Sequence, residues 1–198
     1  MPRVTPMKRL VTLLLPLLCC AVAAGADDSS PLIAGMFSPQ RLAPDFSIRA
    51  SDGGELKLSR YRGKVVLLSF GYTACSAVCP VTLAVLAQAH RKLGALGENL
   101  QVVYLTVDPE RDDAERMRKY LTTFDPSFIG GTGTAAQLAA VRQDYGIAAT
   151  KIPTADGYVM SHSSYVYLID RAGYLCALMP FGHVADDYVH DVSELLRK

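Results

Sequence analysis

Lys64-Val-Val-Leu-Leu-Ser-Phe-Gly-Tyr-Thr-Ala-Cys-Ser-Ala-Val-Cys-Pro80 is the stretch that decides the fold of this chain. Its first seven residues form a continuous apolar run bounded by turn residues, which predicts a strand buried on both faces. The residues from Pro80 to about Leu93 predict a helix, because proline suits the first helical turn. Cys75 and Cys79 therefore fall between a strand and a helix. That is the edge of a sheet where α/β domains place their chemistry.

Strand and helix signals alternate through the rest of the chain, which predicts a three-layer α/β domain with a central mixed sheet flanked by helices. A short connection with a glycine joins the last two apolar runs, as in a hairpin. A glycine at 146 ends the third helical stretch. The expected elements after the first helix are a strand at 100–107, helices at 110–124 and 134–145, strands at 164–169 and 174–179, and an amphipathic helix from Val184 to Leu196.

The N-terminus differs from the rest of the chain. Three basic residues precede an apolar run from Leu10 to Ala24, and small residues follow it. This is the layout of a secretory signal peptide, and the run is short for a membrane helix, which needs roughly 20 residues. We therefore expect a signal peptide or short N-terminal anchor at 1–26, a flexible linker at 27–42 and one domain at 43–198.

Charge and cysteine content narrow the function classes. The chain has 198 residues with 20 basic and 19 acidic side chains, so it shows no electrostatic footprint for nucleic acid. Removal of the first 26 residues leaves three of the five cysteines, Cys75, Cys79 and Cys176. We expect an exported domain, in a compartment where thiols tend to oxidise. Two closely spaced cysteines there must be kept reduced, cycled or occupied by a metal.

The cysteine pair has the chemistry of a soft-metal site. A helix N-terminus stabilises negative charge, so it is expected to lower the pKa of both thiols. Pro80 disfavours helical dihedrals at Cys79, which predicts both sulfurs in the turn before the helix. Two thiolates favour Cu(I), zinc or an iron–sulfur cluster. Structural zinc and cubane clusters want four protein ligands, whereas two sulfurs and one imidazole suit three-coordinate Cu(I), with Cu(II) left open.

His162 is the candidate imidazole. It lies in a polar loop, Met160 to Ser164, directly before an apolar strand. A loop histidine taken alone is more often a solvated side chain than a ligand. The residues by themselves therefore leave its role open. We assign structural roles to the other side chains of this kind, namely His90, His183, His190, Met160 and the buried thiol of Cys176.

Other functions remain as alternatives. A metal-independent thiol-disulfide oxidoreductase would need only Cys75 and Cys79 as a redox pair. A peroxidase is suggested by Ala43-Pro44-Asp45-Phe46, but Tyr72 stands where such enzymes carry Thr or Ser. The glycine-rich stretch 130–134 lacks the ending of a phosphate loop and more simply caps a helix at Thr132 or Thr134. A binding module without chemistry would expose reactive thiols for no gain.

Four segments of the chain together resemble the SCO/SenC family. Their combination is far more specific than a lone pair of cysteines, and they occur in family order across most of the chain from about Pro44. The segments are Gly71-Tyr-Thr-Ala-Cys-Ser-Ala-Val-Cys-Pro80, Val107-Asp-Pro-Glu-Arg-Asp112, Phe128-Ile-Gly-Gly-Thr-Gly-Thr134 and His162-Ser-Ser-Tyr-Val-Tyr-Leu-Ile-Asp170.

The resemblance implies a thioredoxin-like fold that faces the periplasm, or the intermembrane space in mitochondria, and copper bound by Cys75, Cys79 and His162. It also implies a part in assembling the copper centre of a respiratory oxidase, by delivering copper or by reducing the target's cysteines. The expected partners are the copper-centre subunit and a periplasmic copper donor or thiol reductant, with a membrane tether through the N-terminus left open. Asp108 fits the family pattern, but an Asp-Pro there also serves as a helix cap.

One departure concerns the residues after the first cysteine. The family usually has Pro-Asp there, and this chain has Ser76 and Ala77. The missing carboxylate removes a negative charge beside the thiols. We expect that change to alter metal affinity, redox potential or partner docking.

Overall fold

The computed structural model describes residues 1–2 and 31–197 of the chain. Residues 3–30 lie outside the described residues. They comprise most of the signal peptide or anchor predicted at 1–26 and the first four residues of the linker predicted at 27–42. Among the described residues, no helix has both the length and the apolar character that a membrane span requires.

A mixed eight-stranded sheet forms the centre of the domain, in the order β1-β10-β9-β4-β5-β6-β2-β3. β4, β5 and β6 run parallel to one another, and the remaining neighbours are antiparallel. Every residue of β4 is buried, as its apolar run predicts. The strands of this sheet are β1 (Gly35–Leu42), β2 (Ser47–Ala50), β3 (Glu55–Lys57), β4 (Val65–Gly71), β5 (Leu100–Thr106), β6 (Ile129–Thr132), β9 (Tyr165–Ile169) and β10 (Tyr174–Pro180).

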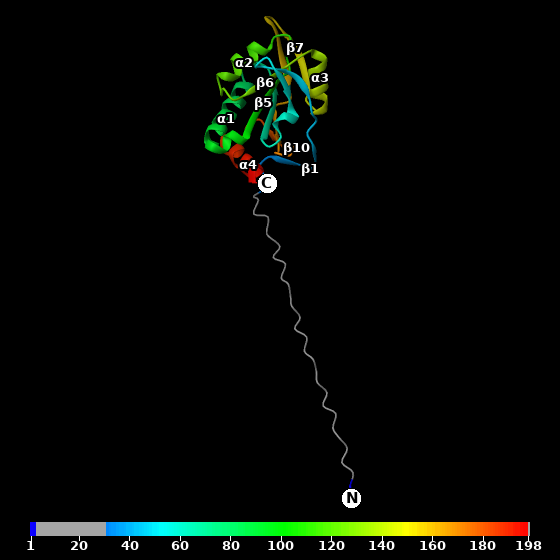
Figure 1. Cartoon of the computed structure of the whole chain (residues 1–198). Helices are drawn as coiled ribbons and strands as arrows, with labels where there is room; N and C mark the ends of the chain where they lie inside the picture. Colours follow the sequence, from blue (N-terminus) through cyan, green and yellow to red (C-terminus); the bar gives the residue numbers. More distant parts are fainter. Residues whose placement is uncertain (3–30, 198) are drawn as a thin grey trace.

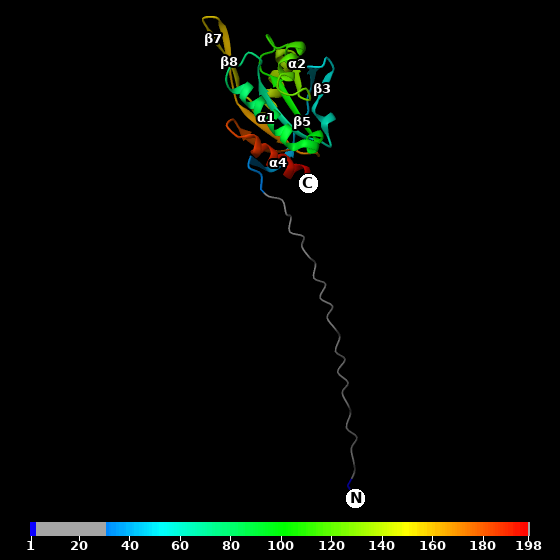
Figure 2. The ribbon, with the colours of Figure 1, turned by 90° about the vertical axis from the view of Figure 1, so that its left-hand side faces the viewer.

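Helices cover both faces of the sheet (Figure 1). α1 (Val78–Leu93) and α4 (Ala185–Arg197) pack against each other, and Figure 2 shows them together in front of the strands. α3 (Ala135–Asp144) lies on the opposite face, and α2 (Ala114–Thr122) packs against β6. The predicted three-layer α/β architecture is therefore confirmed.

Side-chain caps set the start of two helices. Asp113, rather than a residue near 110, begins α2 by accepting the N–H of Arg116 at 2.8 Å. Thr134 begins α3 through a reciprocal capping box with Gln137, whose N–H lies 3.2 Å from the Thr134 hydroxyl. The expected helix cap in the glycine-rich stretch is thus Thr134, whereas Thr132 belongs to β6, a strand that the sequence did not predict.

β1 corrects the linker that the sequence suggested over 27–42. Residues 35–42 pair antiparallel with β10, and the backbone N–H groups of Ile33 and Ala34 bond to the fully buried carboxylate of Asp191 at 2.8 and 2.9 Å. The strand was missed because seven of its eight side chains are exposed, so it lacks the alternating apolar face that marks a strand in sequence.

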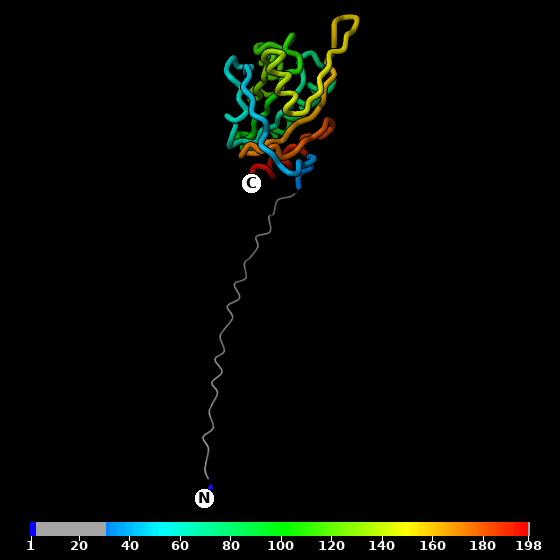
Figure 3. Tube along the Cα trace, turned by 90° about the vertical axis from the view of Figure 1, so that its right-hand side faces the viewer, coloured from blue at the N-terminus to red at the C-terminus, as the bar shows by residue number. Residues whose placement is uncertain are grey.

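A second correction concerns the segment before β9, which was interpreted as a loop. β7 (Ala149–Thr154) and β8 (Gly157–His162) form a separate two-stranded ribbon. It projects from the body of the domain in Figure 2 and, as a tube, in Figure 3. His162 is the last residue of β8, so the ribbon sets its direction.

Gly131 supplies a test of the packing under β6. A Cβ at this position would lie 2.5 Å from Leu105, 2.7 Å from Ile48 and 2.8 Å from Leu56. We expect Gly131→Ala to lower the free energy of unfolding by about 1–3 kcal/mol, because overpacking a closed core forces side chains off their rotamers. Urea denaturation of the two proteins measures the difference.

Gly35→Ala is the matched control, since its added Cβ would meet nothing closer than 3.7 Å. Equal stability of the Gly131→Ala variant and the parent would show that this contact layer is not tight.

Candidate metal centre

The two cysteines occupy different environments at the end of β4. Cys75 is half-buried in the loop before α1, and its N–H bonds to the Tyr72 carbonyl at 3.3 Å. Cys79 is 3% exposed and belongs to the first turn of α1. The expectation that Pro80 would keep Cys79 out of the helix is wrong, because the helix starts at Val78 and the proline still lies in the first turn, where its missing N–H costs nothing.

Gly71 lets the Cys79 sulfur pack against the end of β4. A Cβ on this residue would lie 2.9 Å from the Cys79 Sγ and 2.0 Å from the Tyr104 hydroxyl. Tyr104, on β5, is buried and interacts with Cys79 through that hydroxyl. The absence of a side chain at position 71 therefore makes the room in which sulfur and phenol meet.

His162 reaches the buried cysteine from the other side. Its Nε2 lies 3.6 Å from the Cys79 Sγ, and its Nδ1 lies 2.9 Å from the Ser163 carbonyl. A carbonyl can only accept, so this contact assigns the ring proton to Nδ1 and leaves the Nε2 lone pair facing the sulfur. Metal-binding histidines typically have this arrangement, with the second ring nitrogen donating to a backbone carbonyl.

The protonation of the two thiols differs for physical reasons. Partial burial acts to raise the pKa of Cys75, but the N–H groups of Cys79, Ala77 and Val78 outweigh it, and the pKa is lowered. Burial raises the pKa of Cys79 to about 12. The predicted effect of the helix N-terminus is therefore confirmed for Cys75 and wrong for Cys79, where loss of water outweighs the helix.

The imidazole is neutral at physiological pH. Burial lowers the pKa of His162, and the hydrogen bond to the Ser163 carbonyl opposes that effect only in part. Cys79 as a thiol and His162 as a neutral base thus form an S–H to Nε2 contact. A metal ion arriving here would replace one proton.

The three predicted ligands are neighbours, but they are not yet a closed cage. Among residues 31–197, no three His, Cys, Asp or Glu side chains are grouped closely enough to hold an ion. Cys79 contacts both His162 and Cys75. The donor set of two sulfurs and one imidazole fits a soft ion.

An apolar cavity of about 210 Å³ adjoins Cys79 and His162. Aliphatic and aromatic side chains of α1 and of the segment before α4 form much of its wall. Such a wall presents apolar surface beside the sulfur and the imidazole. Residues of this wall include Val78, Val81, Val85, Phe181 and Val184.

The remaining histidines have structural partners, as expected. His90 Nδ1 lies 2.9 Å from Asp125, and both His183 and His190 lie 2.9 Å from a carboxylate in α4. Met160 is half-buried and packs against the core, and Cys176 is buried in β10 with its thiol 3.3 Å from the Tyr174 carbonyl.

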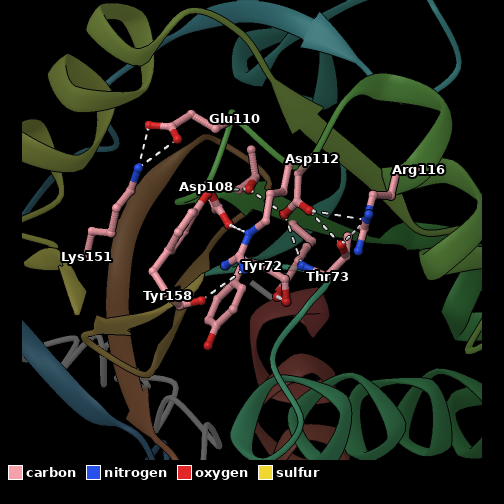
Figure 4. Close-up of polar contacts among 11 residues, drawn as sticks. Tyr72, Thr73, Asp108, Glu110, Asp112, Arg116, Lys151 and Tyr158 are labelled. Atoms are coloured by element: carbon pink, nitrogen blue, oxygen red, sulfur yellow. Dashed lines mark hydrogen bonds and ion pairs between the residues drawn. The ribbon is translucent and has the colours of Figure 1, made fainter. Parts of the chain in front are cut away.

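The buried carboxylate of Asp112, next to the cysteine loop, was not predicted from the sequence. Asp112 is fully buried and accepts the Thr73 N–H at 3.0 Å and the Thr106 hydroxyl at 2.7 Å. Figure 4 shows Asp112 between Thr73 and Arg116. The contacts tie the start of the cysteine loop to the end of β5. Only the family resemblance of the segment 107–112 hinted at this role.

Asp108 is not the helix cap that the sequence allowed. Its buried carboxylate pairs with Arg111 and accepts the Tyr158 hydroxyl at 2.8 Å, so it joins the loop after β5 to β8. Asp113 caps α2 instead.

Comparison with known proteins gives a consistent picture. The family model described as SCO1/SenC matches residues 35–197. A mitochondrial SCO2 homolog from Mus musculus is 36% identical over 133 residues, which cover 65% of this chain and 52% of the relative. A mitochondrial SCO1 homolog from Arabidopsis thaliana is 33% identical over 155 residues, covering 77% and 46%. This chain therefore spans about half the length of these relatives.

Solved structures resemble the domain closely. Bradyrhizobium japonicum ScoI with copper bound has a TM-score of 0.73 at 32% identity, covering 79% of this chain and all of that one. Apo Sco1 from Thermus thermophilus has a TM-score of 0.76 at 31% identity, covering 84% and 98%. The thioredoxin-like fold expected from the resemblance is confirmed.

The difference between the two thiols predicts unequal reactivity. Alkylation needs the thiolate, so in the reduced protein Cys75 should react first, with a pH midpoint below that of an ordinary cysteine. Cys79 should stay unmodified until far above neutral pH, because its folded-state pKa is about 12. Iodoacetamide labelling across pH, followed by peptide mass spectrometry, measures both. Equal labelling at neutral pH would contradict the assignment, and Cys75→Ser is the control that should lose the fast phase.

The position of Ala77 lets us predict the effect of the carboxylate that the family usually has there and this chain lacks. It is the N-cap residue of α1 and has no capping side chain, so first-turn N–H groups are left to the Cys75 sulfur. We expect Ala77→Asp to raise the pKa of Cys75 by about one unit, because the carboxylate competes for these donors and repels the thiolate. The alkylation profile measures the shift. Ala77→Asn matches the shape without the charge, and an Asp variant that titrates like the Asn variant would refute the charge effect.

Proposed function

This chain belongs to the SCO1/SenC family, and we propose that it is a periplasmic protein that binds copper through Cys75, Cys79 and His162. We further propose that it serves the assembly of the copper centre of a respiratory oxidase, by delivering Cu(I) or by reducing the cysteines that will receive it. The observation that carries the proposal is the His162 Nε2 lone pair, 3.6 Å from the Cys79 Sγ.

The donor chemistry supports copper over other soft ions. Cys79 supplies a buried sulfur, His162 a neutral nitrogen with a fixed tautomer, and Cys75 a sulfur whose pKa is already lowered. A structural zinc site would want a fourth protein ligand. Copper-bound Bradyrhizobium japonicum ScoI and copper-bound yeast Sco1, the latter with a TM-score of 0.71 at 25% identity, covering 79% of this chain and 89% of that one, share this fold.

Export to the periplasm is part of the proposal and rests on the sequence. The basic residues, the short apolar run and the small residues of segment 1–26 are typical of a signal peptide. The copper-centre subunit of the oxidase is the proposed target, and a copper donor or thiol reductant in the same compartment is the proposed supplier. A tether through the N-terminus would keep the domain near a membrane-bound target.

The thiol chemistry also supports a metal-independent alternative. The Cys75 thiolate could attack a disulfide of a partner and form a mixed disulfide. Cys79 would then attack Cys75, releasing the partner as a dithiol and leaving a Cys75–Cys79 disulfide. Two electrons pass to the partner, so a periplasmic thiol reductant must restore the pair. The raised pKa of Cys79 would slow the second step, and this alternative gives His162 no role.

Copper binding by the histidine is the test of the proposal. The reduced mature domain is titrated with Cu(I) in competition with a chromophoric chelator. We expect His162→Ala to weaken Cu(I) binding by about 100-fold or more, because the variant keeps the two thiolates and lacks the third donor. Cys79→Ser should weaken it further. His190→Ala is the matched control, since His190 pairs with Asp191 on α4.

The outcomes separate the alternatives. Binding by the His162→Ala variant as tight as by the parent would refute the three-ligand site. A parent domain that binds no Cu(I) yet reduces disulfides would favour the oxidoreductase. Turnover of peroxide by Cys75 would favour the peroxidase.

A further inference from the structure

The ligand His162 lies on a ribbon that does not belong to the main sheet. β7 and β8 pair only with each other among the described strands. A two-stranded hairpin alone is marginally stable in water. At its base, Ser163 N–H bonds to the Ala148 carbonyl at 3.1 Å. Contacts further along the ribbon must therefore fix the direction in which it approaches the cysteines.

One face of β8 lies against the domain. Tyr158, Met160 and His162 are half-buried, whereas Gly157, Val159 and Ser161 are exposed. This alternation places Tyr158 and His162 on the same face of one strand, about 13 Å apart at roughly 3.3 Å per residue. A contact that holds Tyr158 therefore also sets the position of His162.

Tyr158 is held by an ion pair in the loop after β5. Its hydroxyl donates to the Asp108 Oδ1 at 2.8 Å, and the Asp108 carboxylate pairs with Arg111. Arg111 Nη1 donates to the Tyr158 carbonyl at 3.0 Å, and its guanidinium lies 3.8 Å from the Tyr158 ring centroid. We call Asp108, Arg111 and Tyr158 the hairpin latch.

An outer ion pair closes over the latch. Lys151, on β7, lies 2.6 Å from Glu110 and 4.2 Å from the Tyr158 ring centroid. Figure 4 shows Lys151 and Tyr158 facing Glu110 and Asp108 across the gap between ribbon and loop. This pair is exposed to solvent, so it adds little, whereas Asp108 is only 2% exposed.

The latch also reaches His162 through an aromatic ring. The Arg111 guanidinium also lies 5.6 Å from the Tyr72 ring centroid. Tyr72 in turn meets His162 edge to face, with centroids 6.0 Å apart and planes at 82°. Arg111 thus touches both the strand that carries the imidazole and the ring that packs against it.

We propose that Asp108, Arg111 and Tyr158 are positioning residues that hold the β7–β8 ribbon so that His162 faces Cys79. The inference rests on the proposed function for the role of His162 as a ligand. With the latch closed, the ribbon is in its binding-competent position. With the latch broken, the fraction of competent molecules falls, and the apparent dissociation constant for metal rises by the inverse of that fraction.

Tyr158 is the residue at which to test the latch. Arg111→Ala would leave a buried, unpaired carboxylate at Asp108 and threaten the fold. Tyr158→Phe removes the hydroxyl and keeps the ring over Arg111, and Tyr158→Leu removes both. Tyr174→Phe is the matched control, because Tyr174 is an exposed tyrosine of β10. Cu(I) affinity is measured for each variant with His162 present and again in the His162→Ala background.

We expect Tyr158→Phe to weaken Cu(I) binding by about tenfold, the effect of losing a hydrogen bond to a charged group, and Tyr158→Leu by more, because the contact of the ring with Arg111 is lost as well. In the His162→Ala background the same changes should have no effect, because the ribbon then carries no ligand. An equal loss in both backgrounds would show a merely structural role and overturn the proposal, as would no loss in either.

A second measurement needs no metal. Hydrogen exchange of the backbone amides of residues 149–162 is followed in the apo protein, and we expect it to accelerate in Tyr158→Leu and not in Tyr174→Phe. Unchanged exchange would overturn the latch. If the parent and His162→Ala bind Cu(I) equally, the proposed ligand set fails, and the exchange measurement still decides whether the latch holds the ribbon.

Discussion

A single buried carboxylate, that of Asp112, connects the parts on which the site is built. It has no exposure to solvent and is satisfied by the Thr73 N–H and the hydroxyls of Thr73 and Thr106. A hydrogen bond to a charged group contributes about 1.5–3 kcal/mol, so the loop after β4 is strongly held at Thr73. The cysteine loop thereby starts from a fixed point at Thr73.

The sequence predicted the elements whose side chains are buried, because burial leaves a recognisable pattern of apolar residues. β4 and β5 are apolar because both faces are buried, and the cysteines fall after β4 as expected. β1 and β7 were missed because nearly all their side chains are exposed and the strands are held by backbone pairing, which leaves no trace in composition. His162 could be assigned only by family resemblance, since its neighbour Cys79 is 83 positions away.

The contrast between the two cysteines also lay beyond the sequence. A helix N-terminus acts on any nearby thiol, and the residues around Cys75 and Cys79 look equally polar. The difference comes from packing, because Gly71 and Tyr104 enclose one sulfur while the other stays on a half-exposed loop. Burial is a property of the whole fold, and here it moves the pKa of Cys79 in the direction opposite to the helix effect.

The three proposed copper ligands are carried by three different kinds of element, and that difference suits an ion that is bound and then passed on. Cys79 belongs to a helix packed on the core, Cys75 to a loop tip and His162 to a ribbon outside the main sheet. A resident metal is best served by ligands on rigid elements that close around it. In the proposed transfer the ligands would leave the ion one at a time, and here each ligand is carried by a different element of the fold. Placement of the three ligands on separate elements is therefore compatible with the proposed transfer of copper.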